Sequence, residues 1–130
     1  MRRFFDSNVL IYAWTTDPKK ARAIEVIAEG GVISVQILNE VANVFRRKLG
    51  RDWQQIEQAL DDIRSAVGAV EPLTLEDHRV ALTLARDHGV PLYDAMIIAV
   101  AQRSQCDVLL SEDLQNGRTF GSLTVTNPFL

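Results

Sequence analysis

The chain has 130 residues, of which 47% are hydrophobic and 24% are charged, and its net charge is −3. These values are ordinary for a soluble globular protein and fit a single domain, residues 1–130, with a buried core. The single cysteine, Cys106, excludes an internal disulfide, and no apolar run approaches the ~20 residues that span a membrane. The N-terminus reaches an acid, Asp6, before any long apolar region develops, which argues against a signal peptide. We therefore expect a cytoplasmic protein.

The apolar pattern predicts strands that alternate with helices. In chain order we expect a strand at 3–6, helices at 8–14 and 18–29, a strand at 32–34, helices at 35–48 and 53–66, a strand at 69–71, helices at 75–88 and from 93 or 94 to 102, and strands at 107–110 and 123–126. This alternation predicts the α/β class, as a three-layer α/β/α sandwich around a mostly parallel sheet.

Capping residues predict where several of these helices begin. Asp17 followed by Pro18 is a favoured helix start, with the acid as N-cap and proline at the first helical position. Ser34 stands where it can cap the helix at 35–48. Asp52 forms a capping box with the glutamine three residues later, and Thr74 caps its helix together with an acid at the same spacing.

Four acids fall where they can gather at one edge of such a sheet. Asp6 and Asp113 lie at or just after strand ends, Glu40 lies in the helix after a strand, and Asp94 lies at the start of another helix. Ligands of α/β folds bind beyond the carboxyl ends of the strands, where the strand order reverses. The positions of these four acids therefore predict a common site.

Each acid also has a purely structural explanation. Asp6 can cap the helix that follows it, Asp113 can be a turn acid, and Glu40 can be a solvated residue at the margin of its helix's apolar stripe. Asp94 begins on the apolar face of its helix, where a carboxylate is costly unless something satisfies it. Free N–H groups at the helix start would do so, and so would a bound cation.

Taken together, the four acids indicate a site for a hard divalent cation. Such cations prefer oxygen ligands, and clustered carboxylates repel one another unless a metal is present. A cation held in this way can activate a water and stabilise phosphate oxygens, which is the chemistry of phosphodiester hydrolysis. No competing nucleophile system is evident: His78 and His88 lack zinc-like partners, Cys106 is more readily explained by packing, and there is no glycine-rich phosphate loop.

Four motifs in this order resemble those of PIN-domain nucleases, and the resemblance extends over essentially the whole chain. They are residues 5–12 (Phe-Asp-Ser-Asn-Val-Leu-Ile-Tyr), 39–41 (Asn-Glu-Val), 93–99 (Tyr-Asp-Ala-Met-Ile-Ile-Ala) and 109–114 (Leu-Leu-Ser-Glu-Asp-Leu). The chain length also resembles that of VapC-like toxins of bacterial toxin–antitoxin pairs, which are single PIN domains.

The resemblance implies a role for each site residue. Asp6, Glu40 and Asp94 would ligate Mg²⁺ or Mn²⁺, Asp113 would complete the site directly or through water, and Asn8 and Ser111 would support the acids by hydrogen bonding. Other family members carry Asp-Phe after the fourth acid, whereas this chain has Leu-Gln-Asn-Gly at 114–117. That difference leaves open whether Glu112 or Asp113 faces the metal; we choose Asp113.

The resemblance further implies a metal-dependent endoribonuclease that leaves a 5′-phosphate and a 3′-hydroxyl, a homodimer, and an antitoxin whose tail covers the site. The net charge does not oppose an RNA substrate, because setting aside the four site acids leaves 13 acids against 14 bases. The basic run Arg46-Arg47-Lys48, with Arg51 nearby, could grip RNA phosphates, although a basic run at a helix end also complements the helix dipole.

Two other classes of function fit the residues less well. Aspartate-based phosphotransfer enzymes normally use a lysine late in the chain, and the last lysine here is Lys48. A non-catalytic RNA- or protein-binding module that kept the fold would be expected to have lost acids, yet all four motifs carry one.

Overall fold

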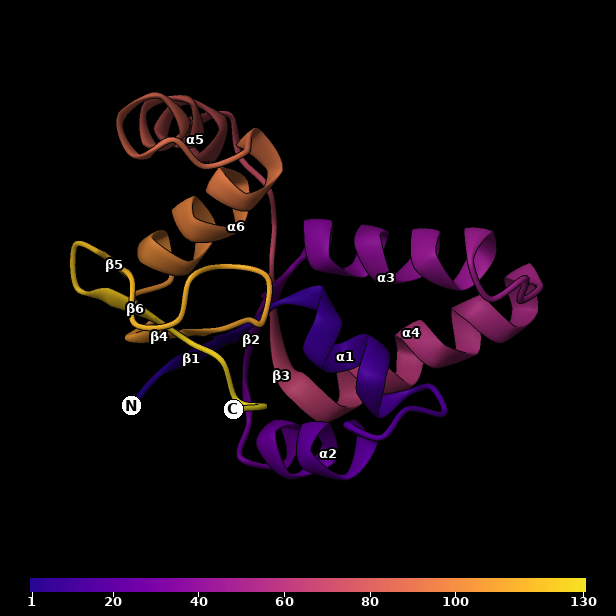
Figure 1. The fold of residues 1–130 in the computed structure, drawn as a ribbon. Coiled ribbons are helices and arrows are strands. Elements are labelled where there is room, and N and C mark those ends of the chain that lie inside the picture. Colours follow the sequence, from indigo (N-terminus) through magenta and orange to yellow (C-terminus); the bar gives the residue numbers. More distant parts are fainter.

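A six-stranded sheet in the order β3-β2-β1-β4-β6-β5 forms the centre of the structure (Figure 1), a computed structural model that describes all residues 1–130. The strands are β1 (Arg3–Phe5), β2 (Gly31–Ser34), β3 (Gly68–Glu71), β4 (Val108–Leu110), β5 (Thr119–Phe120) and β6 (Leu123–Thr126). The helices are α1 (Ser7–Ala13), α2 (Lys20–Ala28), α3 (Val35–Arg47), α4 (Trp53–Val67), α5 (Leu75–His88) and α6 (Leu92–Arg103). All neighbouring strands pair in parallel except β5 and β6, so the predicted mostly parallel sheet is confirmed.

Helices cover both faces of this sheet. The chain passes from β1 to β2 to β3 through α1–α4 and then returns past β1 to β4 through α5 and α6. Because parallel crossovers are right-handed, this reversal places α5 and α6 on the face opposite the first four helices, as Figure 1 shows. The carboxyl ends of β1 and β4 therefore lie where the direction of the chain reverses, which is the usual ligand position in such folds.

The core is continuous across the sheet because the central strands are covered on both faces. Phe4 and Phe5, successive residues of β1, are both fully buried. Gly31 leaves room for the second of these rings: a Cβ there would lie 2.6 Å from Cε2 of Phe5 and 2.8 Å from the carbonyl oxygen of Arg3. The middle of α6 is buried nearly all round between the sheet and α5. No helix is long and apolar enough to cross a lipid bilayer.

One expected helix start and one expected side-chain cap were wrong. Helix α2 begins at Lys20 rather than at Pro18, because Oδ1 of Asp17 accepts the N–H of Lys19 over 2.8 Å and so stabilises a turn before the helix. Ser34 does occupy the N-cap position of α3, but its buried hydroxyl makes no hydrogen bond. By contrast, both expected capping arrangements are present, at the starts of α4 and α5.

Two further differences lie in the second half of the chain. Helix α6 begins at Leu92, so that Asp94 is its third residue and Pro91 occupies the N-cap position. Strand β5 was not predicted, because two residues carry no readable alternation and its only partner is β6 in a tight antiparallel pair. The other predicted strands and helices are present with shifts of about one residue.

Candidate functional site

Asp6 follows β1 directly and is the most buried of the four acids, with 3% of its surface exposed. Its backbone N–H donates to the carbonyl of Leu110 on β4, which ties the two strand ends together. Oδ1 accepts the N–H of Ser7 over 2.7 Å, and Oδ2 accepts the hydroxyl of Ser111 over 2.6 Å. Burial, together with the nearby negative charges of Glu40 and Asp113, raises the pKa of Asp6 to about 7 in spite of these two hydrogen bonds.

Asp113 lies in the loop after β4 and is held by the two residues predicted to support the acids. Nδ2 of Asn8 donates to its Oδ2 over 3.1 Å, and Oγ of Ser111 accepts its backbone N–H over 3.1 Å. Ser111 is fully buried and therefore connects Asp6 and Asp113 through one hydroxyl. Both residues that the family resemblance implied as supports are thus hydrogen-bonded to site acids.

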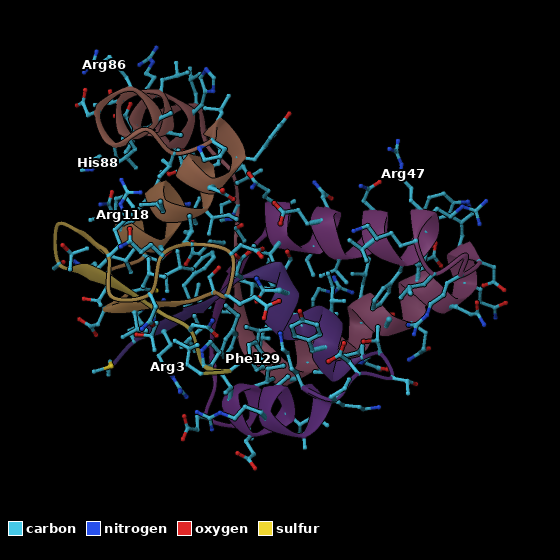
Figure 2. The ribbon with its side chains drawn as sticks, in the orientation of Figure 1. Arg3, Arg47, Arg86, His88, Arg118 and Phe129 are labelled. Carbon is cyan, nitrogen blue, oxygen red and sulfur yellow. The ribbon has the colours of Figure 1, made fainter.

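Glu112, the alternative fourth acid, is occupied elsewhere. Its carboxylate accepts the hydroxyl of Tyr12 and pairs with Nζ of Lys19, which lies 2.7 Å away. Although partial burial raises its pKa, the hydrogen bonds from Lys19 and Tyr12 hold the pKa of Glu112 below its ordinary value. Lys19 also lies over the rings of Tyr12 and Phe129, and Figure 2 shows Phe129 beside α1. Glu112 therefore fastens the loop to Tyr12 of α1 and to Lys19 just before α2.

Glu40 projects from the first half of α3 and is held by two side chains that the sequence did not single out. Oε1 accepts the hydroxyl of Ser7 over 2.9 Å, and Oε2 accepts Nε2 of Gln36 over 2.9 Å. The same Gln36 nitrogen donates to the carbonyl of Tyr93 over 2.8 Å. Gln36 is 7% exposed, so it fixes the first turn of α6 relative to Glu40. Its spacing of four residues before Glu40 was the one available signal.

Asp94 differs from the other three acids because no hydrogen bond reaches its carboxylate. It is half-buried at the third position of α6, and no side chain caps this helix. Burial raises the pKa of Asp94, and the charges of Asp113 and Glu40 raise it further. The alternative explanation of Asp94 as a helix cap is therefore not met in the structure.

These mutual effects show that the four acids share one electrostatic environment at the carboxyl edge of the sheet. No three Asp, Glu, His or Cys side chains are grouped as a ready-made cage for an ion. Mg²⁺, however, typically keeps several waters and binds through one or two carboxylates, so direct contact with every acid is not required. An unpaired, half-buried carboxylate beside two other acids fits such a cation in its donor chemistry.

Comparison with known proteins identifies the fold family. The profile of the PIN domain family matches residues 3–118. The chain belongs to the PIN domain family. No curated protein sequence matches this PIN domain significantly.

Three solved structures show the same fold. VapC20 of Mycobacterium tuberculosis, described as a sarcin–ricin loop cleaving toxin, aligns with a TM-score of 0.71 and 19% identity over 85% of this chain and 91% of that chain. A toxin–antitoxin complex from Klebsiella pneumoniae aligns with a TM-score of 0.73 and 21% identity over 98% of both chains. VapBC2 from Rickettsia felis, bound to a DNA fragment from its promoter, aligns with a TM-score of 0.70 and 16% identity over 98% of both chains. These structural neighbours are VapC toxins of VapBC pairs or toxin–antitoxin complexes.

The basic run at the end of α3 is only partly free in this PIN domain. Arg51 donates to the carbonyl of Trp14 over 3.1 Å and its guanidinium lies 4.3 Å from the centre of the Phe45 ring. Arg46 donates to the carbonyl of Arg51, whereas Arg47 extends outward from α3 (Figure 2). Arg51 has a structural role through its hydrogen bond and its ring contact. Contact with RNA stays a prediction for the four basic residues Arg46, Arg47, Lys48 and Arg51.

Proposed function

We propose that this PIN domain is a Mg²⁺- or Mn²⁺-dependent endoribonuclease and the toxin of a toxin–antitoxin pair. The observation that carries the proposal is Asp94, a half-buried carboxylate without a hydrogen-bond donor whose pKa is raised by burial and by Asp113 and Glu40. Leaving a charge in this state is costly, and a bound cation removes the cost. The solved neighbours include a toxin described as cleaving the sarcin–ricin loop, and toxin–antitoxin complexes.

In this proposal Asp6, Glu40 and Asp94 hold the cation, and Asp113 completes the site directly or through a water. The cation, when bound, would lower the pKa of a bound water and stabilise phosphate oxygens. The protein's own contribution is orientation: Ser111 and the N–H of Ser7 fix Asp6.

The other supports act in the same way on the remaining acids. Gln36 and the Ser7 hydroxyl fix Glu40, and Asn8 fixes Asp113. We choose Asp113 over Glu112 as the fourth acid, because Glu112 is neutralised by Lys19 and bonded to Tyr12. Supporting side chains of this kind typically change metal affinity or activity ten- to a hundredfold when they are removed.

RNA as substrate, water as nucleophile and a 5′-phosphate on the product belong to this proposal. So do a homodimer and a small antitoxin that covers the site. The neighbours from Klebsiella pneumoniae and Rickettsia felis were solved as toxin–antitoxin complexes, which supports the antitoxin. A cytoplasmic location is also part of this proposal.

The proposal is tested with purified protein, freed of any antitoxin, and structured RNA in the presence of Mg²⁺ or Mn²⁺. We expect cleavage that EDTA abolishes and that leaves 5′-phosphorylated products. Asp6→Asn and Asp94→Asn should each remove it while circular dichroism shows an intact fold. Asp62→Asn, at an exposed acid of α4, is the matched control and should cleave normally. Unchanged cleavage by both site variants would refute the mechanism.

A further inference from the structure

A pocket beside the far half of α3 combines an exposed aromatic ring with two arginines. Its volume is about 420 Å³. Its lining residues are Asn39, Ala42, Asn43, Arg46, Arg47 and Trp53. No acid lines this pocket, although the chain as a whole is acidic. The pocket therefore brings positive charge, amide groups and an aromatic surface together without an acid.

Trp53 is placed unusually for a tryptophan. It is the first residue of α4 and 60% of its surface is exposed, whereas burial of this large side chain would stabilise the fold. The guanidinium of Arg46 lies over the indole at 5.0 Å from the ring centre and is itself anchored on the carbonyl of Arg51. One face of the ring is thus held by a cation, and much of the rest is open to solvent.

The pocket continues directly from the acid cluster along α3. Gln36, Glu40, Asn43 and Arg47 follow one another at intervals of four, three and four residues, so they form one stripe on one face of the helix. At ~1.5 Å per residue, Arg47 lies about 10 Å beyond Glu40 along the helix axis. That separation spans about three stacked nucleotides of one strand, at ~3.4 Å each.

We propose that this pocket is a subsite for an unpaired base of the RNA substrate, which stacks on Trp53 two or three nucleotides from the cleaved bond. The inference rests on the proposed ribonuclease function and adds the substrate class, single-stranded or looped RNA. Single-stranded RNA is recognised by stacking of splayed bases on aromatic rings and guanidinium planes. Arg47 provides the charge for a neighbouring phosphate, and Asn39 and Asn43 provide amide groups that can reach a base edge.

The test measures binding of an unpaired RNA oligonucleotide by fluorescence anisotropy, and cleavage of the same RNA, for the wild type and three variants. Trp53→Ala should weaken binding roughly five- to a hundredfold, which is the usual effect of losing one base–aromatic stack. Trp53→Phe keeps a stacking surface and should restore most of the affinity. Leu75→Ala is the matched control, because Leu75 is also the exposed first residue of a helix that follows a capping box.

Two further measurements separate stacking from charge. An oligonucleotide that lacks the base two or three nucleotides from the cleaved bond should bind equally to wild type and Trp53→Ala. Arg47→Ala should lower the slope of log affinity against log salt concentration by about 0.7, whereas Trp53→Ala should leave that slope unchanged.

Each outcome decides between the pocket and the function. If the wild type cleaves RNA and Trp53→Ala binds the RNA as tightly as the wild type does, the subsite is overturned and the proposed function stands. The same result with altered oligomeric state or weaker antitoxin binding would show that the pocket contacts a protein, which also overturns the proposal. A wild type that neither binds nor cleaves RNA would overturn the proposed function together with the subsite.

Discussion

Replacing Asp6 by asparagine should stabilise the metal-free protein, although the proposed function needs this carboxylate. The pKa of Asp6 is raised from 3.8 to about 7, so the folded state holds a proton that the unfolded chain releases. The free energy of unfolding should therefore fall as the pH rises through the window from about 4 to 7. At ~1.4 kcal/mol per pKa unit, ionised Asp6 costs the folded protein about 4 kcal/mol above this window.

Asparagine avoids that cost but keeps only part of the hydrogen bonding. Its Oδ1 can still accept the N–H of Ser7, while the hydroxyl of Ser111 loses its carboxylate acceptor at a cost of about 2 kcal/mol. The net gain is about 2 kcal/mol, which corresponds to a rise in Tm of about 7 °C for a chain of 130 residues. Thermal unfolding in EDTA at pH 8 measures it. At pH 5, where ionisation of Asp6 would cost only about 1.7 kcal/mol, the gain should disappear.

Asp77 provides the matched control with the opposite sign. It is as buried as Asp6, but hydrogen bonds from Arg103 and Thr74 outweigh burial and hold its pKa below the ordinary value. Its contribution to stability is present above pH ~4 and is lost as the pH falls further. Asp77→Asn should therefore lower stability at pH 8 by about 2 kcal/mol. The reasoning fails if Asp6→Asn is no more stable than wild type at pH 8, or if its gain is the same at both pH values.

Three other changes test the site and the fold. Glu112→Gln should keep the rate of RNA cleavage within about threefold of wild type, whereas Asp113→Asn should lower the rate at least ~10-fold. Both rates are measured at saturating Mg²⁺. Gln36→Ala frees Glu40 and should raise the Mg²⁺ concentration for half-maximal cleavage about ten- to a hundredfold. Loss of its two hydrogen bonds should also lower Tm by several degrees. Gly31→Ala pushes a Cβ into the ring of Phe5 and should cost about 1–3 kcal/mol in urea unfolding; a smaller cost would show that β1 and β2 can separate there.

The order of strands and helices could be predicted because the hydrophobic periodicity is local. Capping boxes at Asp52 and Thr74 also depend only on residues three apart, and both are present. The start of α2 was misplaced because the hydrogen bond from Lys19 to Asp17 competes with helix capping over the same few residues. The pairing of β5 with β6 was missed because two residues are too few to show alternation.

The site could be predicted only as far as its residues belong to short motifs. Asp6 and Asp94 stand at strand and helix ends that the sequence itself marks. The choice between Glu112 and Asp113 depends on Tyr12 and Lys19, which lie 100 and 93 residues from Glu112 along the chain. Sequence order carries no signal for such contacts, because folding alone brings these residues together.

The four acids differ in whether their carboxylates accept hydrogen bonds from the protein. Asp6, Glu40 and Asp113 each accept hydrogen bonds from the protein, so replacing any of them also leaves a buried donor without its partner. Asp94 accepts none, and its charge is opposed by burial and by the other acids. Asp94→Asn therefore removes a charge without breaking a hydrogen bond, and its metal-free stability should equal or exceed that of wild type. Loss of RNA cleavage in this variant, with Tm unchanged or raised, would assign the defect to cation binding rather than to the fold.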